Sequence, residues 1–564
     1  MSARERHNTM VLPRPRPQTP TVLALTRREL LRRAGVGGAA LMLPGVLAAC
    51  EGPDGPVSSE ATAPSTGTEP SGGAAIEELT WGTTAIRALD YASGFDVSTG
   101  VPLGVALESL LTYDADLRLT PLLAESWSQP DPETYVFVLR SGVTFWDGTP
   151  LTTEDVVFSL ERHRDPEVAS EMGYYFNSVD SVEATGPSEV TVRLNAPDPF
   201  FAYVHTFASI TPKAFSEELG SQLGAPGTPV NAMGTGPYRI TAFRADDAID
   251  LERNESYWGE QPTIERITVE IFADPQTMQL AMRAGEIDGT FQVPLAQADQ
   301  WSGIDGATTI FSPGMTIIGL YFRVTEEPWS DIHVRRAFAY SIDREGLVRS
   351  VLGDHAQVAS CVVPPSQWGG LLSPDAVAAL YEELSHYSFD PDRAREELAQ
   401  SSVPDGFSAT VQYPNNLPEV GNAFQNLREN LAPLNVDLEV TEVTPQEWFA
   451  DLEARTFPFG IIAFGPDYAD PANYPAIVFS EGSDSNRADF QNPDVTRLLE
   501  EQQAATDPAV RAEAISQILR ITTAELPYLN LWWPEAVMAI SERLQYDDFS
   551  PLWYNQVWVD NLSA

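Results

Sequence analysis

Cysteine and basic residues are both scarce in this chain. Its 564 residues include two cysteines, Cys50 and Cys361, so a framework of several disulfides is excluded and a hydrophobic core must stabilise the fold. We predict that Cys361 fills this core. Acidic residues outnumber Lys and Arg by 80 to 34. A formal net charge of −46 gives no bulk attraction to nucleic acid or to an anionic membrane surface, and we interpret the charge as serving solubility.

The short motifs of common catalytic and metal sites are also missing. The chain has no Gly-x-Ser-x-Gly elbow, no His-Glu-x-x-His and no phosphate-binding Gly-x-x-x-x-Gly-Lys, and its six histidines have no metal-ligand spacing. We therefore predict that the protein is not an enzyme and uses no cofactor and no metal. A secreted hydrolase with two catalytic carboxylates is the enzyme alternative, because a chain so rich in acids always offers a pair.

The N-terminal residues 1–49 contain a short apolar stretch but no run long enough for a stable membrane span. An arginine pair at 27–28 precedes the apolar residues 34–49, which are interrupted by Gly and Pro. This order is typical of a twin-arginine signal peptide. The stretch ends in Leu-Ala-Ala-Cys, which resembles a bacterial lipobox, where a peptidase cuts before a cysteine that carries lipid. We predict a signal peptide over 1–49 and lipidation of Cys50.

The segment that follows the lipobox predicts a tether. Residues 51–75 are rich in Gly, Pro, Ser and Thr, a composition typical of flexible linkers. Residues 50–75 would thus consist of a lipidated cysteine and a flexible tether. The predicted location of the folded body is extracytoplasmic, anchored by lipid to the outer face of the cell membrane.

Strand and helix patterns alternate along the rest of the chain. Residues 135–140 and 143–146 predict a β-hairpin around Ser141-Gly142. Thr152 with Asp155 three residues later predicts a helix N-terminus, and Asp-Pro pairs at 390–391 and 507–508 predict two more. Because the chain is too long for one core, these patterns favour an α/β protein of several lobes.

The segment 119–162 closely resembles the signature of the extracellular solute-binding protein family 5, the peptide and nickel binding proteins of ABC importers. Further segments that resemble the family follow in its order. They are GTGPY at 234–238, LERNESYW at 251–258, AGEID at 284–288, DIHVRRAFAYSIDR at 331–344, YADP at 468–471 and LPY at 526–528. The resemblance covers nearly everything after the tether, and the chain is identified as a member of this family.

The resemblance implies an α/β, two-lobed periplasmic-binding-protein fold of class II type, with an extra domain beside the first lobe. The implied parts are a discontinuous first lobe at 76–112, 205–308 and 526–564, an extra domain at 113–204 and a second lobe at 309–525. Chain crossings near 309 and 526 would be the hinge about which the lobes close.

The resemblance also implies a function. It predicts a monomeric substrate-binding lipoprotein that captures peptides by closure of two lobes and delivers them to ABC transporter permease subunits in the membrane. Within the family, a nickel chelate, an oligosaccharide and an opine are alternative ligands. We favour peptide over nickel because the sequence shows no cluster of His or carboxylate residues near the expected cleft.

Residues 96–102 resemble a first-lobe loop that contributes extended backbone to the ligand in peptide-binding relatives. On this basis Thr99, Gly100 and Val101 are predicted to contact the ligand through main-chain hydrogen bonds. The relatives carry an acidic residue where this chain has Thr99. Oligopeptide binders often have an arginine within the stretch matching 461–464, but this chain has none there, so recognition of a ligand carboxylate stays open.

An apolar run ending at Phe464 predicts a buried strand, and Asp467 follows it after Gly465-Pro466. A carboxylate at such a place needs a donor or a cation. In peptide-binding relatives the aspartate at this place, preceded by an aromatic residue like Phe464, pairs with the free α-amino group of the peptide. We therefore predict Asp467 and Phe464 as ligand-binding residues. The alternative is that Asp467 caps the next turn or pairs within the protein, and we predict Asp470 as a turn residue.

Overall fold

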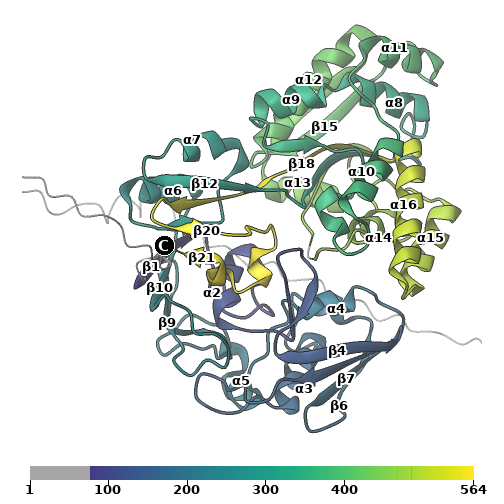
Figure 1. Cartoon of the computed structure of the whole chain (residues 1–564). Helices are drawn as coiled ribbons and strands as arrows, with labels where there is room; N and C mark the ends of the chain where they lie inside the picture. The colour runs from purple at the N-terminus through teal and green to yellow at the C-terminus, as the bar shows by residue number, and fades with distance from the viewer. Residues whose placement is uncertain (1–75, 467, 484, 564) are drawn as a thin grey trace, which may run out of the picture. The chain divides into compact units, whose positions relative to one another are not determined.

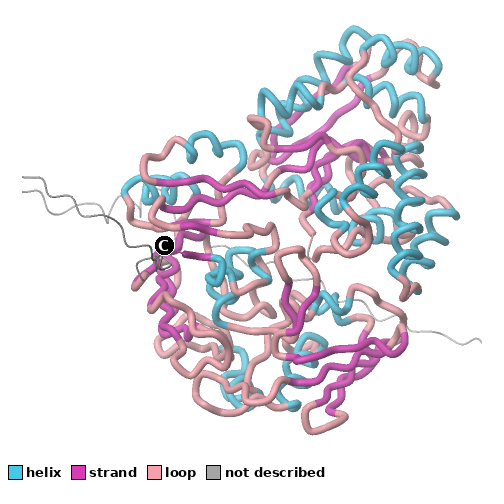
Figure 2. Tube along the Cα trace, viewed as in Figure 1, coloured by secondary structure: helices cyan, strands magenta, loops and turns pink. Residues whose placement is uncertain are grey.

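The computed structural model describes residues 76–466, 468–483 and 485–563 (Figure 1). The predicted signal peptide, Cys50 and the tether lie outside the described residues, and so does Asp467. Within these described ranges, no helix has the length and apolar character that a membrane crossing requires. Strands and helices alternate along the chain, as the sequence predicts, and Figure 2 shows the strands gathered into separate sheets.

Within the described residues, seven strands form the first-lobe sheet, in the order β12-β19-β11-β1-β10-β9-β8. They are β1 (Glu78–Thr83), β8 (Tyr238–Arg244), β9 (Ala248–Arg253), β10 (Arg266–Ile271), β11 (Gly289–Thr290), β12 (Ala307–Ser312) and β19 (Ala536–Ser541). Strand β1 runs parallel to β10 and β11, and the other pairs are antiparallel. Trp81 of β1 is fully buried against Phe291 and Trp558. Three distant stretches of chain thus share one core.

In the described part of the chain, four antiparallel strands form the second-lobe sheet, in the order β14-β18-β13-β17. They are β13 (Ile317–Phe322), β14 (Ala356–Val358), β17 (Phe459–Phe464) and β18 (Tyr528–Pro534). Every residue of β13 is buried, and its alternating side chains enter a different core on each face of the sheet.

Helices cover both faces of the second-lobe sheet. One face carries α8 (Ile332–Ser341), α9 (Arg344–Val351), α11 (Pro391–Gln400) and α12 (Pro418–Leu431). The other carries α10 (Pro374–Glu383), α14 (Asn473–Phe479), α15 (Pro493–Ala504) and α16 (Pro508–Glu525). The predicted helix starts are confirmed, since Asp390 caps α11 and Asp507 caps α16. Strands β15 (Ser408–Pro414) and β16 (Asp437–Val443) form a small parallel pair beside α12.

A third sheet, the extra-domain sheet, has the strand order β4-β5-β7-β6 within the described residues. Its strands are β4 (Ala124–Asp131), β5 (Thr134–Leu139), β6 (Val179–Ala184) and β7 (Glu189–Leu194), and α3 (Thr153–Glu161) packs on them (Figure 1). The capping box of Thr152 and Asp155 is confirmed. The predicted hairpin of 135–140 with 143–146 is wrong. Both edges of β5 are occupied by β4 and β7, and 143–146 contributes only an isolated bridge between Thr144 and Pro150.

Strand pairing corrects the two expected hinge crossings. Strand β12 pairs with β19 as far as Ser312, so the chain leaves the first-lobe sheet over 313–316 rather than near 309. Strand β18 pairs with β13 and β14, so the return crossing is at Glu535 rather than near 526. The crossings touch, since a Cβ atom on Gly314 would lie 1.8 Å from the carbonyl oxygen of Pro534. A residue without a side chain is therefore required at Gly314.

Cys361 is a core residue, as predicted. It is 1% exposed, and its thiol donates a hydrogen bond to the carbonyl oxygen of Val363 at 3.3 Å. Burial raises the pKa of Cys361 to about 12, so the thiol stays protonated near neutral pH and is a poor nucleophile.

Candidate ligand-binding site

Phe464, a predicted site residue, is the last residue of β17. Strand β17 pairs with β13, which places Phe464 opposite Ile317. The hydroxyl of Tyr474 donates to the carbonyl oxygens of Phe464 and Met315, both at 2.9 Å. The Phe464 ring is half-buried and lies 6.4 Å from the Tyr474 ring. The end of the strand is therefore fixed at the point where Gly465 and Pro466 lead to Asp467.

Tyrosines from distant parts of the chain contact the residues on both sides of Asp467. The hydroxyl of Tyr554 donates to the carbonyl oxygen of Pro466 at 3.3 Å, and the N–H of Ala469 donates to the hydroxyl of Tyr113 at 3.4 Å. The ring of Tyr468 stacks with that of Tyr203 at 5.2 Å and 14°. Asp467 itself lies outside the described residues, but its neighbours join the second lobe to the other parts of the body.

The expectation of an extended loop at 96–102 is wrong, because these residues begin helix α2 (Val97–Ala106). The carboxylate of Asp96 caps the helix by accepting the N–H of Thr99 at 2.9 Å and its hydroxyl at 3.1 Å. Thr99 and Val101 are fully buried, and the carbonyl oxygen of Val101 accepts a hydrogen bond from the Trp558 indole at 2.9 Å. Because these groups are already paired inside the protein, they offer no strand edge to a ligand.

Gly100 still links α2 to the candidate site, through Tyr554. A Cβ atom on Gly100 would lie 2.5 Å from the Cβ of Tyr554, so the glycine makes room for that side chain. Tyr554 in turn reaches Pro466, the residue before Asp467. The side chain of Tyr554 therefore contacts both Gly100 on α2 and Pro466 just after β17. No local pattern in the sequence marks Tyr113, Tyr203 or Tyr554 for this role.

Asp470 is more than the turn residue that the sequence predicts. It accepts the N–H of Ala472 at 2.9 Å, as a turn residue does, but its side chain is 1% exposed. The guanidinium of Arg511 donates to both carboxylate oxygens at 2.9 Å, and the hydroxyl of Tyr203 donates to Oδ2 at 3.1 Å. Burial lowers the pKa of Arg511, but the charge and hydrogen bond of Asp470 together with the nearby Tyr203 and Tyr135 outweigh this, so the pKa is raised overall. The aspartate is therefore the centre of a buried charged network.

The arginines that the structure places near this region already have carboxylate partners. Arg511 pairs with Asp470. Arg455, the basic residue nearest to the strand in the sequence, forms an ion pair with Asp489 and donates to the carbonyl oxygen of Asn486 at 3.2 Å. We therefore assign neither Arg511 nor Arg455 to a ligand carboxylate.

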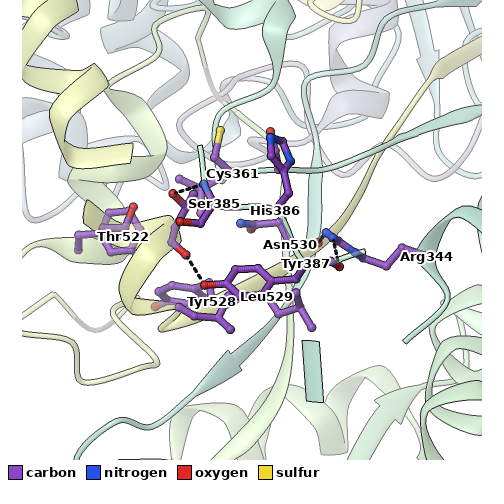
Figure 3. A pocket seen from close by; sticks show the side chains of 14 residues that line it. Arg344, Cys361, Ser385, His386, Tyr387, Thr522, Tyr528, Leu529 and Asn530 are labelled. Carbon is purple, nitrogen blue, oxygen red and sulfur yellow. Dashed lines mark hydrogen bonds between the residues drawn. The ribbon is translucent and has the colours of Figure 1, made fainter. Parts of the chain in front are cut away.

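A separate cavity lies inside the second lobe and is lined by Arg344, Cys361, His386, Tyr387 and Asn530 among others (Figure 3). Its volume is about 20 Å³, enough for about one water molecule. Arg344 donates to the carbonyl oxygens of Ala359, Asn530 and Tyr387 at 2.7 to 2.9 Å, and burial lowers its pKa to about 10. The cavity is too small for a peptide, and Arg344 ties separate segments of this lobe together.

In the described ranges, no three side chains of His, Cys, Asp or Glu come together in the way that metal ligands do. Two sheets joined by adjacent chain crossings, with a third sheet beside the first, give the two-lobed fold of the periplasmic binding proteins of known structure. Residues 118–486 match the family described as bacterial extracellular solute-binding proteins, family 5 middle, and the chain belongs to this family. Its members are substrate-binding proteins of ABC transport and are not enzymes.

Individual relatives agree with this membership. The glutathione-binding protein GsiB of Shigella flexneri serotype 5b is 27% identical over 461 residues, which cover 78% of this chain and 85% of that protein. The solved structure of DppA from Helicobacter pylori in complex with the peptide STSA has a TM-score of 0.69 at 22% identity, covering 86% of this chain and 97% of DppA. NikZ from Campylobacter jejuni in complex with Ni(L-His) has a TM-score of 0.67 at 20% identity, covering 83% and 94%. The two structures show that the fold is shared.

Proposed function

We propose that this protein captures short peptides between its two lobes and delivers them to the permease of an ABC importer. One observation carries the proposal. Pro466, Tyr468 and Ala469 are contacted by side chains from outside the second lobe, Tyr554, Tyr203 and Tyr113, so the described residues on either side of the predicted amine-binding position lie where the lobes meet. A ligand at such a place touches both lobes and stabilises their closed arrangement.

A peptide suits this place chemically. Asp467 would pair with the free α-amino group of the ligand, and Phe464 would cover the apolar part of its first residue. The charge of a desolvated ammonium is matched by a carboxylate at short range. The relative GsiB is named as a glutathione-binding protein, and DppA is solved with the peptide STSA. Glutathione and STSA are both peptides with a free amine. Gly100 would act indirectly, by making room for Tyr554, and Thr99 and Val101 by holding α2 in place through Asp96 and Trp558.

A nickel chelate is the second candidate, because NikZ of the same fold is solved with Ni(L-His). In such a complex the amino nitrogen of histidine binds the metal and is not a free ammonium, so this ligand would not use the proposed pairing with Asp467. An opine and an oligosaccharide are weaker alternatives. A secreted hydrolase is the enzyme alternative, and the experiment that tests the proposal distinguishes it from a binding protein.

The experiment is native mass spectrometry after competition. Protein that has been unfolded, washed and refolded is offered an equimolar mixture of trialanine, N-acetyl-trialanine, nickel with histidine, and maltotriose. We expect one added mass, that of free trialanine, and recovery of the peptide uncleaved. Selection of nickel with histidine would replace the peptide by the second candidate, and cleaved trialanine would support a hydrolase.

We further propose that Cys50 carries lipid and anchors a monomeric body to the outer face of the cell membrane. In the variant Cys50→Ala we expect most of the protein to move from the membrane fraction to the soluble extracytoplasmic fraction, because the lipid is the anchor. Cell fractionation with immunoblotting measures this, and the buried-cysteine variant Cys361→Ser is the matched control for loss of a thiol. Equal retention of Cys50→Ala and wild type in the membrane fraction would refute the anchor.

A further inference from the structure

The segment 197–203, which follows strand β7 of the extra-domain sheet, contacts the second lobe at several points. The carbonyl oxygen of Pro197 accepts a hydrogen bond from the side-chain amide of Gln503 on α15 at 2.9 Å. The Phe200 ring stacks with the ring of Tyr468 at 5.3 Å and 29°. Phe200 also packs against the second-lobe core that contains α14, α15 and α16.

Tyr203 adds a second ring and a hydrogen bond to this contact. Its ring stacks with Tyr468 at 5.2 Å, so Tyr468 of the second lobe stacks with two rings of the same segment. Its hydroxyl donates to Asp470 at 3.1 Å, and Asp470 is paired with Arg511. Burial, together with the carboxylate of Asp470, raises the pKa of Tyr203 well above its usual value. The hydroxyl therefore stays protonated and able to donate at any physiological pH.

The segment is fixed on its own side as well. The hydroxyl of Tyr135 on β5 donates to the carbonyl oxygen of Asp198 at 2.9 Å, and the hydroxyl of Ser178 donates to the carboxylate of Asp198 at 2.9 Å. The short helix α4 (Phe201–Val204) buries Phe201 and Val204 in the core beneath the extra-domain sheet. A contact surface that is already ordered loses little entropy when it docks.

We propose that segment 197–203 is a latch through which the extra domain holds the second lobe in the closed arrangement without help from the ligand. Every contact of the latch is between protein groups, so the latch raises the closed fraction of the ligand-free protein, in addition to the contacts of Tyr113 and Tyr554. Where this fraction is small, the apparent dissociation constant rises in inverse proportion to it. The effect on ligand affinity rests on the proposed function, whereas the effect on closure does not.

Variants can remove single latch contacts while keeping the fold. Phe200→Ala removes the stacked pair with Tyr468 and the packing on the second-lobe core, Tyr203→Phe removes only the hydroxyl to Asp470, and Gln503→Ala removes the bond to Pro197. The matched controls are Tyr413→Phe and Gln517→Ala. Tyr413 donates to Glu442 and Gln517 donates to Glu513, both within the second lobe. The controls thus lose the same groups without touching the extra domain.

Closure is measured by double electron–electron resonance between spin labels at Glu183→Cys on β6 and Glu500→Cys on α15, in the full-length chain with Cys50→Ala. Both positions are exposed, whereas Cys361 is buried and protonated, so labelling is selective. In ligand-free protein, Phe200→Ala should lower the ratio of the population at the short distance to the population at the long distance. We expect a change of about two- to tenfold, the effect of one aromatic pair. Tyr203→Phe should lower it at least about threefold. The controls should match the parent protein.

Trialanine titrations on the same proteins test the coupling to binding. The dissociation constants of the latch variants should rise by the factor by which the closed fraction falls. Unchanged distance distributions in Phe200→Ala and Tyr203→Phe would overturn the latch, whatever the affinity. If the parent protein does not bind trialanine, the proposed function fails, and the ligand-free distances still decide the latch.

Discussion

Replacement of Asp467 by Asn is expected to abolish the preference of this protein for peptides with a free amine. In the wild type, the carboxylate of Asp467 is predicted to pair with the ligand ammonium where both are withdrawn from water. Removal of one partner of such a pair costs about 3 to 5 kcal/mol, which is roughly a hundredfold to several thousandfold in the dissociation constant. Calorimetric titration with trialanine and with N-acetyl-trialanine measures both values.

The comparison of the two peptides distinguishes a ligand role from a structural one. Wild type should bind free trialanine far more tightly than the acetylated peptide, and Asp467→Asn should bind both about equally. Asp494→Asn, which removes an exposed carboxylate on α15, is the matched control and should behave as wild type. Equal weakening of both peptides in Asp467→Asn would mean that the side chain acts within the protein.

Loss of the Asp470 carboxylate should be the most destabilising change near the candidate site. Asp470 is 1% exposed and Arg511 is 12% exposed, so Asp470→Asn leaves an arginine charge almost without solvent or partner. We expect the free energy of unfolding of the second lobe to fall by about 3 to 5 kcal/mol. Urea denaturation followed by tryptophan fluorescence measures the change.

A double-mutant cycle isolates the pair. Removal of both charges in Asp470→Asn with Arg511→Met should restore much of the lost stability, because no unpaired buried charge is left. The exposed pair of Arg497 and Asp494 is the matched control, and Asp494→Asn should cost less than about 1 kcal/mol. Similar small losses at the two sites would show that the Asp470 pair is not buried in solution.

Structure that depends on neighbouring residues was predictable from the sequence. The cap of Thr152 and Asp155 joins residues three positions apart, and the caps at Asp390 and Asp507 are equally local. The same local reasoning applies to Asp96 and Thr99, whose spacing also fits a helix start. There the resemblance to a family loop predicts extended backbone, which is the wrong conformation.

Pairing between distant segments was not predictable in the same way. Strands β18 and β19 form one apolar run in the sequence, yet they belong to different sheets, which is why the crossing expected near 526 lies at Glu535. The candidate site shows the same limit. Phe464 is a prediction from the strand pattern and the family resemblance, whereas Tyr113, Tyr203 and Tyr554 come from segments with no motif of their own. Arg511 was missed because its partner Asp470 lies 41 residues away.

Small-angle scattering of the wild-type protein with and without trialanine tests the central claim most directly. The account requires a ligand that touches both lobes and therefore shifts the population toward the closed arrangement. A saturating concentration of trialanine should lower the radius of gyration, and acetylated trialanine at the same concentration should not. An unchanged radius at saturating trialanine, with binding verified by calorimetry on the same sample, would contradict capture by closure.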